Sequence, residues 1–160
     1  MSTNLTRAIT VLGAILVLLA VNHSIRAKER IIRSGEAIYL ALAPVDPRSL
    51  MQGDYMALRF QLADQLDAEG AENRANLRVP IVLDERHIAT LAKQGASTDR
   101  FIRYRLRDGR AWLGTNAYFF EEGSAARFAN ARFGELRLDR ESGEAVLIGL
   151  RDAELKALPR

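Results

Sequence analysis

The sequence has no cysteine and only two histidines, His23 and His87, among its 160 residues. The absence of cysteine excludes disulfide frameworks, zinc–thiolate sites, iron–sulfur clusters and cysteine nucleophiles. Two histidines are too few for a histidine-rich metal site, so we predict neither a metal site nor a cofactor. The composition is otherwise that of one ordinary small globular domain, with 48% hydrophobic and 27% charged residues.

Residue patterns for nucleophilic catalysis are also lacking, and we predict no catalytic residue. A Ser-His-Asp triad in the C-terminal domain would have to use His87, and no serine lies in a Gly-x-Ser-x-Gly motif. A Ser-Lys dyad has only Lys93 and Lys156 to draw on there. The sequence therefore favours a protein that is not an enzyme, with a hydrolase as an alternative.

One long apolar run stands at the N-terminus, where no charged residue occurs between Ala8 and Val21. A helix from Leu5 to Asn22 or His23 just reaches the roughly 17 to 20 residues that cross a bilayer, provided that Arg7 snorkels toward the head groups. We therefore predict a transmembrane helix from Leu5 to Val21 that is retained as a signal anchor.

Two other interpretations of this run are weaker. A cleaved signal peptide needs a small-x-small site, which Ala20 to Ser24 matches poorly. A buried helix of a soluble protein needs a large surrounding core, which the remaining residues can hardly supply.

The segment Ser24 to Ser34 is predicted to continue the helix out of the membrane, with Gly35 at its C-cap. Residues 1–35, the predicted anchor and flank, carry a net charge of +4, and residues 36–160, the predicted soluble domain, carry −1. The basic excess therefore points to anionic lipid head groups and not to nucleic acid. Charge does not decide the orientation, because the positive-inside count and the translocation of a long following domain point in opposite directions.

Residues 36–160 predict a mainly β (α+β) fold, a small antiparallel β domain of seven or eight strands with one short covering helix. Asp108-Gly109 and Glu141-Ser142-Gly143 each mark a hairpin. We expect an exposed, partly helical loop at 63–76, and a helix at 84–93 is the alternative to a turn and return strand. The strands are predicted at 37–43, 55–62, 78–83, 88–92, 100–106, 110–115, 136–138 and 146–150, and the helix at 124–132 begins with Ser124 as N-cap.

The aromatic residues of the second half of the domain have two interpretations. They line a ligand groove, or they are simply core beside a helix, which is the more common case. The set comprises Trp112, Tyr118, Phe119, Phe120, Phe128 and Phe133. Arg103, Arg105 and Arg107 share one strand face, which we interpret as solvated or paired with acids.

The segment 44–60 reads PVDPRSLMQGDYMALRF and carries the most unusual motif. Asp46-Pro47 starts a turn, Gly53 accepts a positive φ, and Asp54 can accept hydrogen bonds from loop amides. Asp46 and Asp54 are predicted to be neutralised by Arg48 and Arg59, with divalent-cation binding as an alternative.

Gly53-Asp54-Tyr55, Leu58 and Phe60 resemble the signature of the GDYXXLXY proteins, a membrane-anchored bacterial family without a known function. Phe60 stands where the family has its final tyrosine, which favours a packing role for this position. The resemblance extends to Pro44–Arg48 and to C-terminal stretches at 107–109, 119–123, 131–135 and 149–152.

The resemblance implies a single N-terminal anchor in the inner (cytoplasmic) membrane, a periplasmic domain and association with multi-spanning membrane proteins. We therefore divide the chain into an anchor with its basic flank, 1–35, and a soluble domain, 36–160. The expected function is that of an accessory or interaction partner, and the alternative is a small-ligand or cation binder, or a hydrolase, that uses the acids of the loop. The expected contact surface comprises Asp46, Pro47, Arg48, Gly53, Asp54, Tyr55, Leu58 and Phe60.

Overall fold

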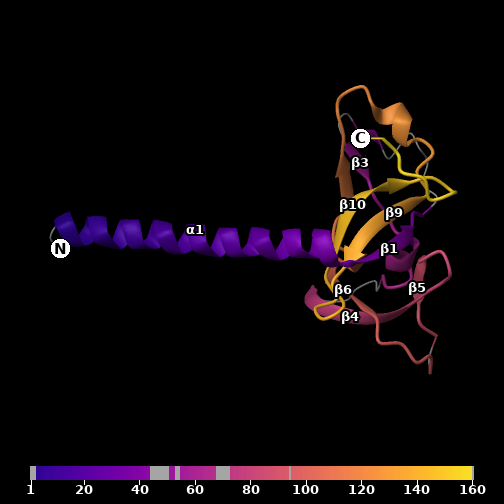
Figure 1. Ribbon diagram of the computed structural model, residues 1–160, viewed down its shortest axis with the longest axis horizontal. Helices are drawn as coiled ribbons and strands as arrows, with labels where there is room; N and C mark the ends of the chain where they lie inside the picture. The colour runs from indigo at the N-terminus through magenta and orange to yellow at the C-terminus, as the bar shows by residue number, and fades with distance from the viewer. Residues whose placement is uncertain (1–2, 44–50, 53–54, 68–72, 94, 160) are drawn as a thin grey trace.

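A computed structural model of the chain describes residues 3–43, 51–52, 55–67, 73–93 and 95–159. Helix α1 (Thr3–Ser34) has 32 residues and projects from one side of a β domain formed by the rest of the chain (Figure 1). At 1.5 Å per residue it is about 48 Å long, which exceeds the roughly 30 Å hydrocarbon core of a bilayer.

The apolar part of α1 is exposed along its length and makes no core with the β domain. Its length and composition suit a helix that crosses a membrane, as predicted from the sequence. The alternative of a buried helix in a soluble protein is therefore wrong.

The last turns of α1 pack against the β domain, where Ile31 is buried. The Gly35 N–H donates to the Ile31 carbonyl at 2.8 Å and ends the helix at the predicted position. The φ of Gly35 is not left-handed, so the requirement for glycine is one of space. A Cβ at residue 35 would lie 2.5 Å from the Ile31 oxygen and 3.1 Å from the Leu138 oxygen.

Ten strands are described, all paired antiparallel within three small sheets. The first has the order β1-β9-β10, with β1 Glu36–Ala41, β9 Phe133–Leu138 and β10 Ala145–Arg151. The second has the order β5-β4-β6-β7, with β4 Arg74–Leu83, β5 Ala89–Leu91, β6 Phe101–Arg107 and β7 Arg110–Trp112. The third has the order β2-β3-β8, with β2 Met51–Gln52, β3 Tyr55–Ala57 and β8 Ala117–Phe119.

The sheets are joined by a parallel bridge between Tyr39 and Ile88 and by the Arg103 N–H, which donates to the Gly143 carbonyl at 2.7 Å. Between them lies one hydrophobic core, to which β1, β4, β6 and β9 contribute side chains that are almost completely buried. These are Ile38, Leu40, Ile81, Ile102, Leu136 and Leu138. The predicted mainly β architecture behind one N-terminal helix is confirmed.

Both predicted hairpins are present. Asp108 and Gly109 have φ values of 51° and 74°, the signs that a type I′ turn requires, and join β6 to β7. The second hairpin joins β9 to β10, and its turn is held by the Ser142 hydroxyl, which donates to Asp139 at 2.6 Å. The turn and return strand after Leu83 are also as predicted, so the alternative helix at 84–93 is wrong.

Three local predictions are wrong. The strand predicted at 55–62 stops at Ala57, and the short helix α3 (Gln61–Asp64) follows, because this turn of helix also buries Leu62 and Ala63 in the core. The strand predicted at 110–115 ends at Trp112. The loop predicted at 63–76 gives way at Arg74 to β4, whose pairing with β6 extends it beyond its apolar residues.

The helix predicted at 124–132 is only one short turn, η1 (Ala125–Phe128), of 3₁₀ type. Ser124 occupies the N-cap position as predicted, but its side chain makes no capping hydrogen bond, and its hydroxyl donates back to the Glu121 carbonyl at 2.6 Å. A single turn is enough to bury Phe128, which is 1% exposed and anchors the segment.

Candidate functional site

The signature residues divide into described and undescribed ones. Asp46, Pro47, Arg48, Gly53 and Asp54 lie outside the described residues. Tyr55, Leu58 and Phe60 are described, and they have different environments.

Tyr55 begins β3 and lies opposite Phe119 of β8, with ring centroids 5.8 Å apart. Leu58 and Phe60 are 6% and 2% exposed and belong to the core. Their burial agrees with the alternation of buried and exposed residues that the sequence predicts from Met56 onward. Leu58 and Phe60 therefore offer no contact surface, whereas Tyr55 is only half-buried.

Arg59 lies between these two buried residues and points outward. It pairs with Asp64 at 2.5 Å and with Asp67 at 3.9 Å. The hydrogen bond with Asp64 raises the pKa of Arg59 further above its usual range. The predicted partners Asp46 and Asp54 lie outside the described residues, so this local network is one that the sequence reasoning did not include.

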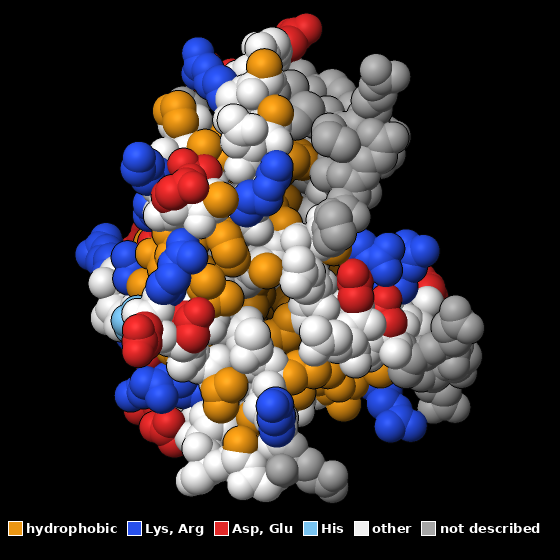
Figure 2. Space-filling view, turned by 90° about the vertical axis from the view of Figure 1, so that its right-hand side faces the viewer, with side chains coloured by type: hydrophobic (Ala, Val, Ile, Leu, Met, Phe, Trp, Pro, Cys, Tyr) orange, Lys and Arg blue, Asp and Glu red, His pale blue; other side chains and the backbone are white. Residues whose placement is uncertain are grey.

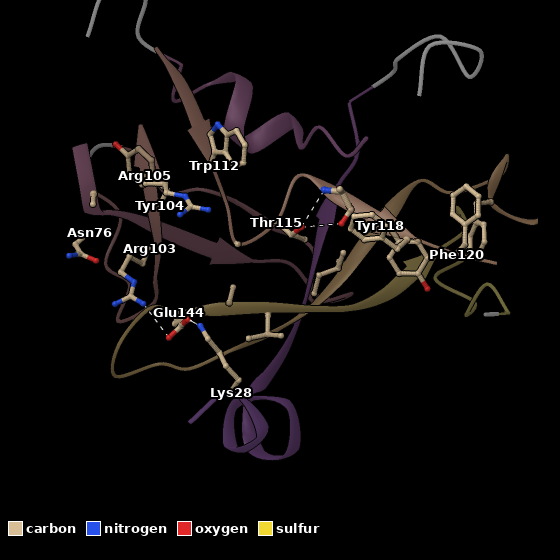
Figure 3. Close-up of a pocket in the computed structure, with 18 of the residues that line it drawn as sticks. Lys28, Asn76, Arg103, Tyr104, Arg105, Trp112, Thr115, Tyr118, Phe120 and Glu144 are labelled. Atoms are coloured by element: carbon tan, nitrogen blue, oxygen red, sulfur yellow. Dashed lines mark hydrogen bonds and ion pairs between the residues drawn. The ribbon is translucent and has the colours of Figure 1, made fainter. Parts of the chain in front are cut away.

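The described residues form a groove of about 990 Å³ that is bounded by β10 on one side and by β6, β7 and β8 on the other (Figure 3). We call it the β8–β10 groove. Helix α1, seen nearly end-on in Figure 3, leaves the domain beside β10, and its Lys28 contributes to the wall. The groove therefore lies on the side of the domain from which α1 projects.

A charged cluster lies at the α1 end of the groove. Glu144 pairs with Arg103, whose Nη2 lies 3.2 Å from its Oε2, and with Lys28 through its other oxygen. One carboxylate is thus shared by two cations that come from different elements. Lys28 is about half exposed, so part of its ammonium group remains open to solvent.

Arg105 adds a third cation to the groove. Its guanidinium lies over the ring of Trp112, 5.4 Å from the centroid, and Arg107 lies 5.9 Å from the same ring. Arg105 forms no ion pair with any residue that the structure describes. Stacking of this kind holds the guanidinium in place while leaving its N–H donors free for an anion.

The aromatic residues serve as both groove and core. Phe128 is buried, and Tyr118 and Phe120 pack on it with ring centroids 5.3 and 5.1 Å away. Tyr118 and Phe120 also face the groove, together with Trp112 (Figure 3). Phe133 does not line it. The spacing of these residues signalled an aromatic cluster, but no local pattern showed which of them face an open space.

The face of the domain opposite α1 has no such character. Acidic and basic side chains are intermingled across it, with hydrophobic side chains between them (Figure 2).

Among the residues that the structure describes, no group of three or more His, Asp or Glu side chains is placed to hold a metal ion.

Comparisons with known proteins agree with the sequence signature. No curated protein and no solved structure matches the chain. The family model described as GDYXXLXY protein matches residues 17–150, from the apolar run through β10. The match covers most of the chain, and the protein belongs to the GDYXXLXY family.

Proposed function

We propose that the protein is a single-pass, membrane-anchored accessory domain that binds another membrane protein on the periplasmic side of the inner (cytoplasmic) membrane. The observation that carries the proposal is the exposure of Phe119, whose side chain is 76% exposed. Among the described residues outside α1, it is the only large hydrophobic side chain that is exposed.

An exposed phenylalanine beside a signature residue is a feature of a contact surface. Phe119 packs against Tyr55, so the two rings form a continuous aromatic surface at the edge of β8. Aromatic side chains are enriched at the centres of protein interfaces, because burying them on a partner removes a large apolar area from water. This surface links the signature to partner binding without any catalytic group.

The anchor supports a partner in the same membrane. Ile31 and the Lys28–Glu144 pair fix the end of α1 to the domain, so the domain stays close to the bilayer. A tethered domain meets other membrane proteins at a high effective concentration, and a small contact surface is then sufficient.

Site-specific photo-crosslinking in native membranes tests the proposal. The full-length chain carries p-benzoylphenylalanine in place of Phe119, and the control carries it in place of Glu85, which is exposed in the turn between β4 and β5. We expect residue 119 to crosslink to one multi-spanning membrane protein and residue 85 not to do so.

A second variant tests the signature. Tyr55→Ser, combined with the crosslinker at residue 119, is expected to weaken the crosslink severalfold while leaving the amount of membrane-bound protein unchanged. Equal crosslinking from residues 119 and 85, or no protein crosslink from residue 119, would contradict the proposed function.

A further inference from the structure

Phe119 is one of the residues that line the β8–β10 groove, but the cations of the groove play no part in the proposed partner-binding surface. We propose that the groove binds the phosphate-containing head group of an anionic phospholipid of the membrane in which α1 is anchored. The inference does not depend on the proposed function, since it is argued from Lys28, Arg105 and Trp112 and not from Phe119.

The first argument is position along α1. The uncharged run ends at Val21 and the predicted span at about His23, and Lys28 follows five to seven residues later. At 1.5 Å per residue, Lys28 is about 7 to 10 Å beyond the hydrocarbon core. The head-group layer is roughly 5 to 7 Å thick on each side of a bilayer. The α1 end of the groove therefore lies at the outer boundary of the head groups.

The second argument is charge. Lys28 and Arg103 share the single carboxylate of Glu144, which leaves this cluster with one excess positive charge. Arg105 adds another, because it has no carboxylate partner among the described residues. Glu121 is the one other acid that lines the groove. The lining therefore carries a net charge of +1, and this excess comes from Lys28 of α1, since the two arginines and the two glutamates of the β domain balance.

The third argument is the apolar part of the lining. Trp112 and Tyr118 are of the two residue types that concentrate at membrane interfaces, where one end of the side chain is apolar and the other is hydrated. Val146 and Leu147 of β10 form the opposite wall. A groove that combines cations with apolar walls suits a phosphate group that carries a glycerol.

The occupant follows from the tether. Because α1 holds the groove at the bilayer surface, phospholipid head groups are present there at a far higher effective concentration than a soluble phosphate compound. The volume of about 990 Å³ is at the upper end of the range for small-molecule sites and admits a head group with its glycerol. An anionic phospholipid is the ligand that combines this position with this charge.

The chain itself supplies the reporter, because Trp112 is the only tryptophan in the sequence and lines the groove. The full-length protein is placed in nanodiscs of phosphatidylcholine with increasing fractions of phosphatidylglycerol. We expect the Trp112 emission to shift to shorter wavelength as phosphatidylglycerol increases, and a spin label on the lipid head group to quench it more than a label at mid-chain.

Matched arginine variants test the binding residue. Arg105 over Trp112 and Arg78 over Phe101 are both stacked on aromatic rings, but only Arg105 lines the groove. We expect Arg105→Gln to raise the phosphatidylglycerol fraction at half-maximal shift about fivefold, the effect of one basic residue near the surface, and Arg78→Gln to leave it unchanged.

If Arg105→Gln does not fold, a second variant with the opposite expected effect on the phosphatidylglycerol fraction still tests the proposal. Glu144→Gln frees Lys28 and Arg103 from their shared carboxylate, so it is expected to lower the fraction of phosphatidylglycerol required. If the Trp112 emission does not shift with the phosphatidylglycerol fraction in either the parent chain or Glu144→Gln, the proposal is overturned, and a protein partner becomes the occupant to test. A full shift produced in pure phosphatidylcholine by millimolar glycerol phosphate would overturn the lipid as its source.

Discussion

The ring of Phe60 lies against the backbone of Gly134, so closely that a Cβ atom at residue 134 would come within 2.8 Å of Phe60 Cε1. The same Cβ atom would lie 3.1 Å from Leu147 Cδ1. The last residue of the signature is therefore packed on β9 at a point where β9 has no side chain. This contact gives a physical reason for an aromatic ring at position 60.

Gly134→Ala is expected to destabilise the domain by about 1 to 3 kcal/mol, because Phe60 or β9 must move to admit the methyl group. Thermal unfolding followed by Trp112 fluorescence measures the change. Gly149→Ala is the matched control on β10, since a Cβ there meets nothing within 4 Å. Equal melting temperatures for the parent chain and Gly134→Ala would show that the contact is not tight.

The ion pair between Glu36 and Arg100 predicts a pH dependence of stability. Arg100 donates to both carboxylate oxygens at 3.0 to 3.1 Å, and the Nε of Arg140 lies 2.9 Å from one of them. The hydrogen bond from Arg100 holds the pKa of Glu36 below its ordinary value, although burial opposes this. The stabilisation is thus complete above the unfolded-state pKa of about 4.3 and is lost as the pH falls through the lower folded-state pKa.

Glu36→Gln is expected to cost about 1.5 to 3 kcal/mol at pH 7, and less as the pH falls below about 4, because the parent chain then loses the same interaction. Thermal melts of both proteins at pH 7 and pH 3 measure the difference. Glu85→Gln, in the exposed turn before β5, serves as the control. A cost that stays constant between the two pH values would exclude this ion pair as its source.

The attachment of α1 to the β domain depends on Ile31, the one buried residue among those of α1 whose side chains are described. We expect Ile31→Ala to destabilise the full chain by about 2 kcal/mol, through loss of buried apolar surface. Ile32→Ala is the control, since Ile32 is 44% exposed. Hydrogen exchange of the last turns of α1 should quicken in the first variant alone, and equal exchange in both would mean that these turns are not fixed to the sheets.

The proposed periplasmic position of the domain predicts the behaviour of fusions after Arg160. Alkaline phosphatase, which folds only outside the cytoplasm, is expected to be active there, and a green fluorescent protein exported in the unfolded state is expected to be dark. The same reporters joined to the N-terminus of the full chain, on the other side of the span, should give the reverse pattern. Phosphatase activity only in the N-terminal fusion would place the domain in the cytoplasm.

Local patterns predicted the features that depend on nearby residues. The apolar run to Val21 needs no partner to form a helix, and Asp108-Gly109 sets a hairpin by its own backbone geometry. The alternation from Met56 to Phe60 correctly indicated buried side chains, although β3 ends at Ala57 and α3 follows. A set of side chains buried on one face is compatible with several backbone conformations, and packing in the core determines which of them forms.

The sequence by itself determined the long apolar N-terminal helix, the mainly β domain and the family, because apolar length, alternation and a contiguous signature are all local properties of the chain. Only the tertiary structure decided that Lys28, Arg103 and Glu144 meet, that Arg105 covers Trp112 and that Phe119 is left exposed. These relationships join residues that are distant in sequence. They depend on how three small sheets pack against each other and against the end of one helix, which no periodicity along the chain encodes.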